Sequence, residues 1–192
     1  DITLRQYWSE LAKNSRLLAE RSFLTSVVFP EELLKQEAEQ PEIHEVLAKE
    51  RSLFTQRRQS VNLQLNLLSQ QIKDSGDEIR ATSTQVEADH SARKLMNEEL
   101  AANRSLLDKG FISNARYISL ERNLNDYQAR LGEHTADLSR ARQKQTDLKL
   151  RAENVRNEYQ QAAAAELKES SDRLNELQQR VRPLLDMAQR QQ

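Results

Sequence analysis

The stretch Leu106-Leu-Asp-Lys-Gly-Phe-Ile-Ser113 is the clearest break in a long run of helical pattern. Gly110 stands where a helix C-terminus favours a left-handed residue, a conformation that costs glycine no steric penalty. Ser113 follows where a hydroxyl can accept a hydrogen bond from the free N–H groups of a new helix. The stretch therefore predicts a reverse turn between two long helices. The same residues are explained equally well if the turn is only a well-capped loop with no further role.

Two apolar contacts are expected to brace this turn. Ile112 and Tyr117 occupy the positions, before and inside the second helix, that form a hydrophobic staple. Phe111 is placed to fold back on Leu106 as the closing contact of a Schellman-type cap. These residues thus have a packing role that requires no partner.

The composition is typical of long helices rather than of a globule. Charged residues make up 31% of the 192 residues and aromatic residues 5%, with only three Gly and three Pro. A coiled coil has this profile because its seam replaces a core. The net charge of −1, with both signs interspersed, gives no basic field, so nucleic acid is not an expected partner. The apolar runs are too short to span a membrane, and the absence of cysteine excludes disulfides and thiolate metal sites.

The N-terminal part predicts two helices before the long ones. Apolar residues at helical spacing indicate an amphipathic helix over residues 2–29, with Tyr7 and Trp8 interpreted as packing residues. The pair Phe29-Pro30 should end it, because proline disfavours the α conformation in the residue before it. A short helix is expected over residues 31–39, and Pro41 suits the first turn of the next helix.

The first of the two long helices is predicted over residues 41–107, where apolar side chains recur in alternate steps of four and three. This period of 3.5 is typical of a left-handed coiled coil. Polar steps gather toward the turn, so the seam weakens there; such positions commonly fix register or partner number. Gly76 costs about 1 kcal/mol in a helix interior and marks a bend or a close approach. The seam positions are Leu47, Phe54, Val61, Leu65, Leu68, Ile72, Ser75, Ile79, Thr82, Val86, Asp89, Arg93, Met96, Leu100, Asn103 and Leu107.

The second long helix is predicted over residues 113–182, with a more regular seam. The repeat skips one residue in the alanine run 162–165, which changes the local winding without ending the helix. Pro183 is expected to end it. The seam positions before the skip are Leu120, Leu124, Tyr127, Leu131, His134, Leu138, Ala141, Gln145, Leu148, Ala152, Val155, Tyr159 and Ala162.

Helix lengths predict the architecture. Each long arm has roughly 70 residues, about 100 Å at the α-helical rise, so the two match as an antiparallel hairpin. The helix over residues 2–29, about 40 Å long, is expected alongside the base as a third helix of the bundle, parallel rather than antiparallel to the helix over residues 41–107. The predicted fold class is all-α: one hairpin domain over residues 1–192, with its tip loop at 108–112 and an additional N-terminal helix packed at its base.

The sequence contains no recognisable catalytic constellation. His44, His90 and His134 are far apart, and none has a second ligand at metal spacing. The carboxylates on exposed helix faces are most simply solvated groups that pair four residues apart. We therefore expect no enzyme activity, no metal and no cofactor.

The residues around the turn resemble a known family. The run Leu100 to Arg122, which contains Arg104-Ser-Leu-Leu-Asp-Lys-Gly-Phe-Ile-Ser-Asn-Ala-Arg-Tyr-Ile-Ser-Leu-Glu-Arg122, resembles the hairpin tip of the HlyD family of membrane fusion proteins. These are the periplasmic adaptors of type I secretion systems. Upstream, Phe29-Pro-Glu-Glu-Leu-Leu34 and Leu53-Phe-Thr-Gln-Arg-Arg58 are similar to the branch that exports proteases and lipases.

The resemblance implies a function and its partners. In that family the hairpin belongs to a periplasmic protein anchored in the inner membrane of a Gram-negative bacterium. It forms a homo-oligomer, usually a hexamer, around an inner-membrane ABC transporter, and its tips meet a TolC-like outer-membrane channel that releases secreted protein cargo. A chain that opens on Asp1 is then expected to be a processed or excised piece. The alternative is a structural coiled-coil spacer or scaffold with no channel partner.

The resemblance also implies a docking site at the tip. Leu106 and Ser113 match the family pattern, in which the serine offers a hydroxyl and the leucine fills a small apolar pocket. The family arginine position is Ala102 here, and Arg104 lies two residues later on another face of the helix. The sequence leaves open whether Arg104 takes that role. The implied docking residues are Arg104, Leu106, Leu107, Lys109, Gly110, Phe111 and Ser113.

Overall fold

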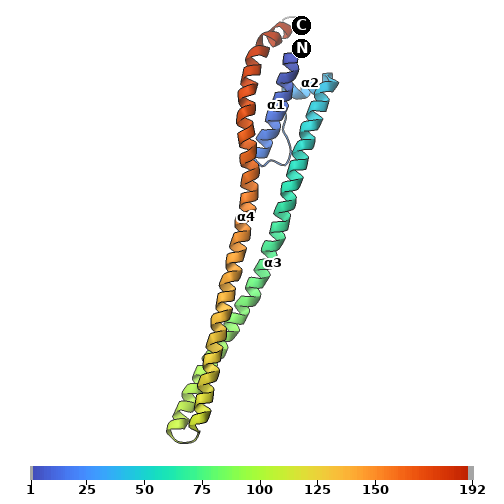
Figure 1. The fold of residues 1–192 in the computed structure, drawn as a ribbon. Helices are drawn as coiled ribbons and strands as arrows, with labels where there is room; N and C mark the ends of the chain where they lie inside the picture. The colour runs from blue at the N-terminus through green and yellow to red at the C-terminus, as the bar shows by residue number, and fades with distance from the viewer. Residues whose placement is uncertain (1, 190–192) are drawn as a thin grey trace. The chain divides into compact units, whose positions relative to one another are not determined.

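The chain is all-α, as predicted. A computed structural model, which describes residues 2–189, contains four helices and no strand within that range. They are α1 (Ile2–Arg21), α2 (Glu31–Glu39), α3 (Pro41–Asp108) and α4 (Asn114–Gln189) (Figure 1). None of these described helices combines the length and the apolar character of a membrane span.

The contacts divide the chain into two compact units. Unit 1 comprises Asp1–Leu67 and Ala152–Gln192, and unit 2 comprises Leu68–Arg151. Both α3 and α4 contribute a segment to each unit. A single domain over residues 1–192 therefore stays a prediction, and its first residue and last three lie outside the described residues.

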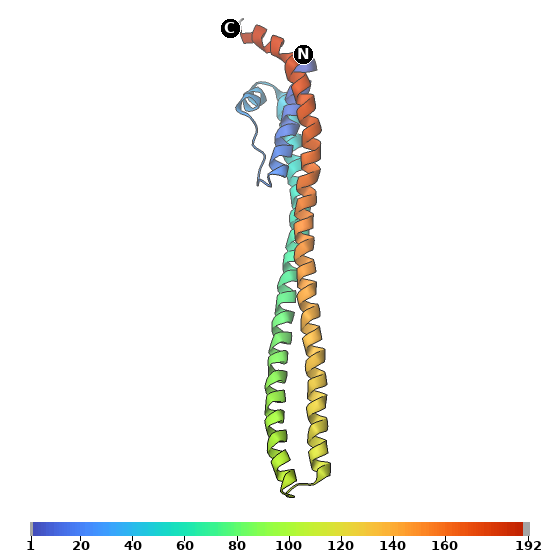
Figure 2. The ribbon, with the colours of Figure 1, turned by 90° about the vertical axis from the view of Figure 1, so that its left-hand side faces the viewer.

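Unit 2 is an antiparallel pair of helices joined by the turn (Figure 2). The sequence separation between cross-helix partners grows from 45 for Asp89 and His134 to 73 for Ile72 and Gln145, as antiparallel pairing requires. Every predicted seam position from Leu68 to Leu107 and from Leu120 to Leu148 is buried or half-buried. The predicted seam is therefore confirmed in this unit. Its most buried apolar cluster consists of Val86, Leu131 and Leu138, with Ile79 packed against it.

Unit 1 is a helical bundle that includes α2, and in it α1 packs against α3 and α4 (Figure 1). The ion pairs Arg5–Glu42 and Glu20–Arg57 both join residues 37 apart, so α1 runs parallel to α3, as predicted. The α1 helix runs antiparallel to α4, since Asn14 contacts Ser170 whereas the Arg21 carbonyl accepts from Gln160. The bundle buries one large apolar cluster: Tyr7, Trp8, Leu11, Ala12, Phe29, Leu33, Ile43, Leu47 and Val181.

The prediction that the first helix continues to residue 29 is wrong, because α1 ends at Arg21. The Phe23 N–H donates to the Glu20 carbonyl at 3.1 Å and the Leu24 N–H to the Ala19 carbonyl at 2.9 Å. These two bonds form a Schellman cap. Its left-handed position is held by Phe23, with φ of 54°, rather than by glycine. Such a conformation costs a non-glycine residue roughly 1–2 kcal/mol.

Contacts with α3 and α4 offset this cost. The Arg58 guanidinium lies 3.7 Å from the centroid of the Phe23 ring and the Arg156 guanidinium 4.4 Å from it. Tyr159 meets the same ring edge-on, with centroids 5.8 Å apart. Arg58 also donates a hydrogen bond to the Leu24 carbonyl. The turn after α1 is thus fixed by long-range cation–π contacts that helical periodicity does not reveal.

The prediction that Pro183 ends the last helix is also wrong. Helix α4 passes through Pro183 and continues to Gln189. Proline inside a helix loses one main-chain hydrogen bond and kinks the helix, but its fixed φ is compatible with a helix. The red end of α4 bends in both views (Figures 1 and 2). Because Val181 is fully buried beside this point, packing holds the helix in place across the proline.

Candidate functional site

The turn between α3 and α4 ends α3 with the predicted cap. The Gly110 N–H donates to the Leu107 carbonyl at 3.0 Å, and the Phe111 N–H donates to the Leu106 carbonyl at 2.9 Å. Gly110 has φ of 75°, the left-handed value that the cap requires. Gly110 therefore shapes the turn, and Leu107 lies half-buried at the last seam position.

Helix α4 begins with the predicted serine cap. The Ser113 Oγ accepts a hydrogen bond from the Arg116 N–H at 3.1 Å. Tyr117 is buried and Ile112 is half-buried, which is the exposure expected of a hydrophobic staple. The loop occupies residues 109–113, one residue later than predicted. Because the cap uses only a lone pair of the hydroxyl, its proton stays free to donate to a partner.

Apolar side chains face solvent at this tip. The Phe111 side chain is 74% exposed and Leu106 is 39% exposed. The predicted closing contact with Leu106 thus gives Phe111 little cover. Ile118, in the first turns of α4, is 45% exposed. The tip therefore offers an apolar surface in addition to its polar groups.

Arg104 interacts with two other residues of the tip. Its guanidinium lies 5.6 Å from the centroid of the Tyr117 ring, and its Nε lies 3.9 Å from Oδ1 of Asp108. A hydrogen bond with Tyr117 raises the pKa of Arg104 above its ordinary value. Lys109 is exposed and makes no ion pair with any residue that the structure describes. Ala102 is exposed and has no charge to offer.

Sequence reasoning did not pair the polar residues of the seam in unit 2. His134 Nδ1 contacts the Asp89 carboxylate, and its Nε2 lies 3.2 Å from the Gln85 amide nitrogen. Gln145 reaches across to donate to the Ile72 carbonyl at 3.4 Å. A Cβ at Gly76 would lie 3.4 Å from this amide, so the two helices approach each other closely at this glycine. The sequence did contain a signal for these pairs, because Asp89, His134 and Gln145 all occupy predicted seam positions.

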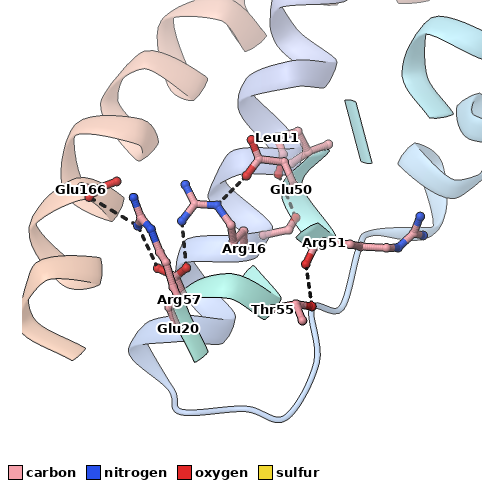
Figure 3. A network of polar contacts seen from close by, with 9 residues as sticks. Leu11, Arg16, Glu20, Glu50, Arg51, Thr55, Arg57 and Glu166 are labelled. Atoms are coloured by element: carbon pink, nitrogen blue, oxygen red, sulfur yellow. Dashed lines mark hydrogen bonds and ion pairs between the residues drawn. The ribbon is translucent and has the colours of Figure 1, made fainter. Parts of the chain in front are cut away.

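A partly buried network of charges joins α1, α3 and α4 in unit 1 (Figure 3). Arg16 of α1 donates to Glu50 of α3 at 2.5 Å and to Glu20 at 2.9 Å. Arg57 bridges Glu20 and Glu166 of α4, at 3.5 and 3.7 Å. Burial alone would lower the pKa of Arg16, but the hydrogen bonds and charges of Glu50 and Glu20 together raise it. The network therefore holds Arg16 in its charged form.

The predictions about chemistry stay predictions. Within residues 2–189, histidines and carboxylates form no group of three or more that could hold a metal ion. The groove between α3 and α4 in unit 2 is lined mostly by charged and amide side chains, including Asp74, Lys144 and Arg151.

Comparison with known proteins identifies the family. The family described as AprE, long alpha-helical hairpin, matches residues 1–187. The chain belongs to this family. Its predicted resemblance to the hairpins of HlyD-type membrane fusion proteins is thereby confirmed.

Two individual proteins illustrate this relationship. The AprE-family hairpin is 25% identical over 190 residues to the type I secretion system membrane fusion protein PrsE of Rhizobium meliloti (strain 1021). That match covers 99% of this chain and 42% of the relative, so the hairpin spans less than half the relative's length. The fold is similar to the crystal structure of the soluble domain of LipC, a membrane fusion protein of a type I secretion system. The TM-score is 0.84 and the identity 20%, over 95% of this chain and 85% of that one.

Proposed function

We propose that this AprE-family hairpin is the adaptor segment of a type I secretion membrane fusion protein. In this proposal it lies in the periplasm, in a protein anchored to the inner membrane beside an ABC transporter. Its tip docks on a TolC-like outer-membrane channel, and secreted protein cargo passes through the assembly. The observation that carries the proposal is the tip itself, which is capped on both sides yet exposes apolar and cationic side chains.

The capped turn suits docking because it is rigid before any partner arrives. Main-chain bonds from Gly110 and Phe111 fix the end of α3, and the Ser113 hydroxyl fixes the start of α4. A surface that is ordered in advance loses less conformational entropy on binding. The tip is small, so one contact would be weak. Several copies around a transporter, six in the usual family arrangement, would add their contacts through a high effective concentration.

Ser113 has a specific part in this proposal. Its oxygen already accepts from the Arg116 N–H, so the contact with a partner uses the hydroxyl proton. The partner group is then an acceptor, such as a main-chain carbonyl or a carboxylate. Leu106, which is 39% exposed near the end of α3, provides an apolar contact in addition.

The alternative function is a structural spacer whose turn has no partner. The polar pairs in the seam and the buried Arg16 network are compatible with it, since both stabilise the helices wherever they are used. The two functions differ at the tip. A spacer tolerates any tip side chain that preserves the caps, whereas an adaptor does not.

Ser113→Arg tests the proposal in the full-length protein with its transporter and channel. Arginine at this cap costs about 1 kcal/mol, which is small for a long hairpin, but it places a bulky cation at the contact. We expect cargo secretion to collapse. Ser113→Ala removes the cap without that bulk, and Ser91→Arg makes the same change on an exposed face of α3. Secretion that survives Ser113→Arg at wild-type level would favour the spacer.

A further inference from the structure

We infer that Phe111 is the apolar anchor of the tip and that its partner presents an apolar socket rimmed by carboxylates. This inference rests on the proposed docking function and assigns the chemistry of the surface that the tip recognises.

The exposure of Phe111 is the first observation. At 74% exposed, it is the most exposed large apolar side chain among the described residues, ahead of Leu63 at 72%. Large aromatic side chains bury much apolar area and dominate the energy of interfaces. The Phe111 ring is also accounted for neither by the seam of unit 2 nor by the staple at Ile112 and Tyr117.

The backbone beneath Phe111 is the second observation. Its own N–H is bonded to the Leu106 carbonyl, and the preceding Gly110 is held in the left-handed conformation. Ser113, two residues later, already caps α4. Phe111 therefore stands between two fixed helix ends with only its two side-chain torsions free. An anchor of this kind is ordered at a low entropy cost.

Local charge is the third observation, and it defines the rim of the socket. Between residues 104 and 116 the charged side chains are Arg104, Lys109 and Arg116 against Asp108 alone. Asp108 is the acidic neighbour of Arg104, at 3.9 Å. Lys109 and Arg116 are exposed, and within the described part of the chain neither forms an ion pair. The whole chain carries a net charge of −1, so this cationic excess is local to residues 104–116.

These three observations fit one kind of partner surface. An aromatic ring flanked by cations is matched by an apolar depression with carboxylates at its edge. The apolar contact would govern how long the complex lasts, because truncating a central anchor acts mainly on dissociation. The rim charges would govern how fast it forms and how strongly salt slows its formation.

The test measures binding of the full-length membrane fusion protein to the purified outer-membrane channel of its secretion system. Association and dissociation rates are recorded at low and high salt for wild type, Phe111→Ala, Phe111→Tyr, Lys109→Glu and Ser113→Arg. The matched control is Leu63→Ala, on the outer face of α3, because Leu63 is nearly as exposed as Phe111. Thermal melting of each variant shows that the helices are intact.

We expect Phe111→Ala to weaken binding at least tenfold, mainly through faster dissociation. Phe111→Tyr should stay within about threefold of wild type, and Leu63→Ala should be unchanged. Lys109→Glu should slow association several-fold and reduce its dependence on salt.

Contrary results separate the two ideas. If Ser113→Arg abolishes binding while Phe111→Ala binds like wild type, docking stands and the anchor is overturned. If Lys109→Glu leaves the association rate and its salt dependence unchanged, the carboxylate rim is overturned. If the channel does not bind wild type, or no tip variant alters binding, the proposed function fails together with the inference.

Discussion

The imidazole of His134 on α4 contacts the carboxylate of Asp89 on α3, inside the seam of unit 2. Their side chains are 23% and 16% exposed, and the apolar cluster of Val86, Leu131 and Leu138 lies beside them. A polar pair at this position stabilises the seam only while both partners are present. It can also specify register, because an apolar residue in either place would leave the other without a partner.

Replacing one member of the pair should therefore cost more than replacing both. We expect His134→Leu and Asp89→Leu each to lower the free energy of unfolding by about 1–3 kcal/mol, since each leaves a half-buried polar group unsatisfied. The double variant should recover most of that loss, because leucines extend the apolar seam. Urea unfolding of the four proteins gives the coupling energy. Simple additivity of the two single changes would contradict the pairing.

Gly110 is required for its backbone conformation and not for lack of space. A Cβ at Gly110 or at Gly132 would meet nothing within 4 Å, but only Gly110 has a positive φ. Gly110→Ala should thus destabilise the chain by about 1 kcal/mol or more. Gly132→Ala, in the interior of α4, should stabilise it by about 1 kcal/mol. The melting temperatures of both variants check this contrast. If the turn were loose and unstructured, Gly110→Ala would not destabilise the chain.

Arg16 should be the most sensitive charged residue of unit 1. Its side chain and that of Glu20 are each 2% exposed, so Arg16→Met leaves Glu50 without its cation and Glu20 with Arg57 alone. We expect a loss of about 3–5 kcal/mol. Arg51→Met is the matched control, because Arg51 is 46% exposed and its pair with Glu37 should contribute about 1 kcal/mol or less. Equal losses for the two variants, measured by urea unfolding, would count against the buried network.

Tyr159 should make the chain sensitive to alkali. Burial, and then the charge of Glu20, raises the pKa of its phenol above the ordinary value of 10.0. The folded state therefore favours the neutral phenol, so its stability is complete below about pH 10 and falls as pH rises through the folded pKa. Its hydroxyl is buried without a hydrogen-bond partner. Tyr159→Phe should stabilise the chain by about 1 kcal/mol at neutral pH and reduce the alkaline loss. If the unfolding curves of Tyr159→Phe from pH 8 to 11 match those of wild type, Tyr159 does not cause the alkaline loss of stability.

The sequence was most informative where the deciding chemistry is local. Gly110 and Ser113 predicted the turn because caps depend on a few neighbouring residues. The seam followed from its period, and it placed Asp89 and His134 on facing helices without revealing that they touch. Comparable lengths of the two arms then predicted the hairpin.

Prediction failed where distant contacts overrode local preference. Phe23 takes a left-handed conformation because Arg58 and Arg156 cover its ring, and no glycine marks the end of α1. Pro183 stays inside α4, next to the buried Val181. Arg16 and Glu50 resemble many other charged residues of the sequence, and only the packing of α1 buries them. At the tip, the sequence predicted that Phe111 folds back on Leu106 and did not reveal that its side chain is exposed.

Site-specific crosslinking in living cells is the most direct test of docking. A photo-activatable amino acid would replace Lys109, which is exposed at the tip, in the full-length protein, and Leu63 would be replaced as the control position. With transporter and channel present and secretion intact, we predict an adduct between position 109 and the outer-membrane channel, and none from position 63. Secretion at wild-type level with no channel adduct from position 109 would contradict the claim that this tip docks on the channel.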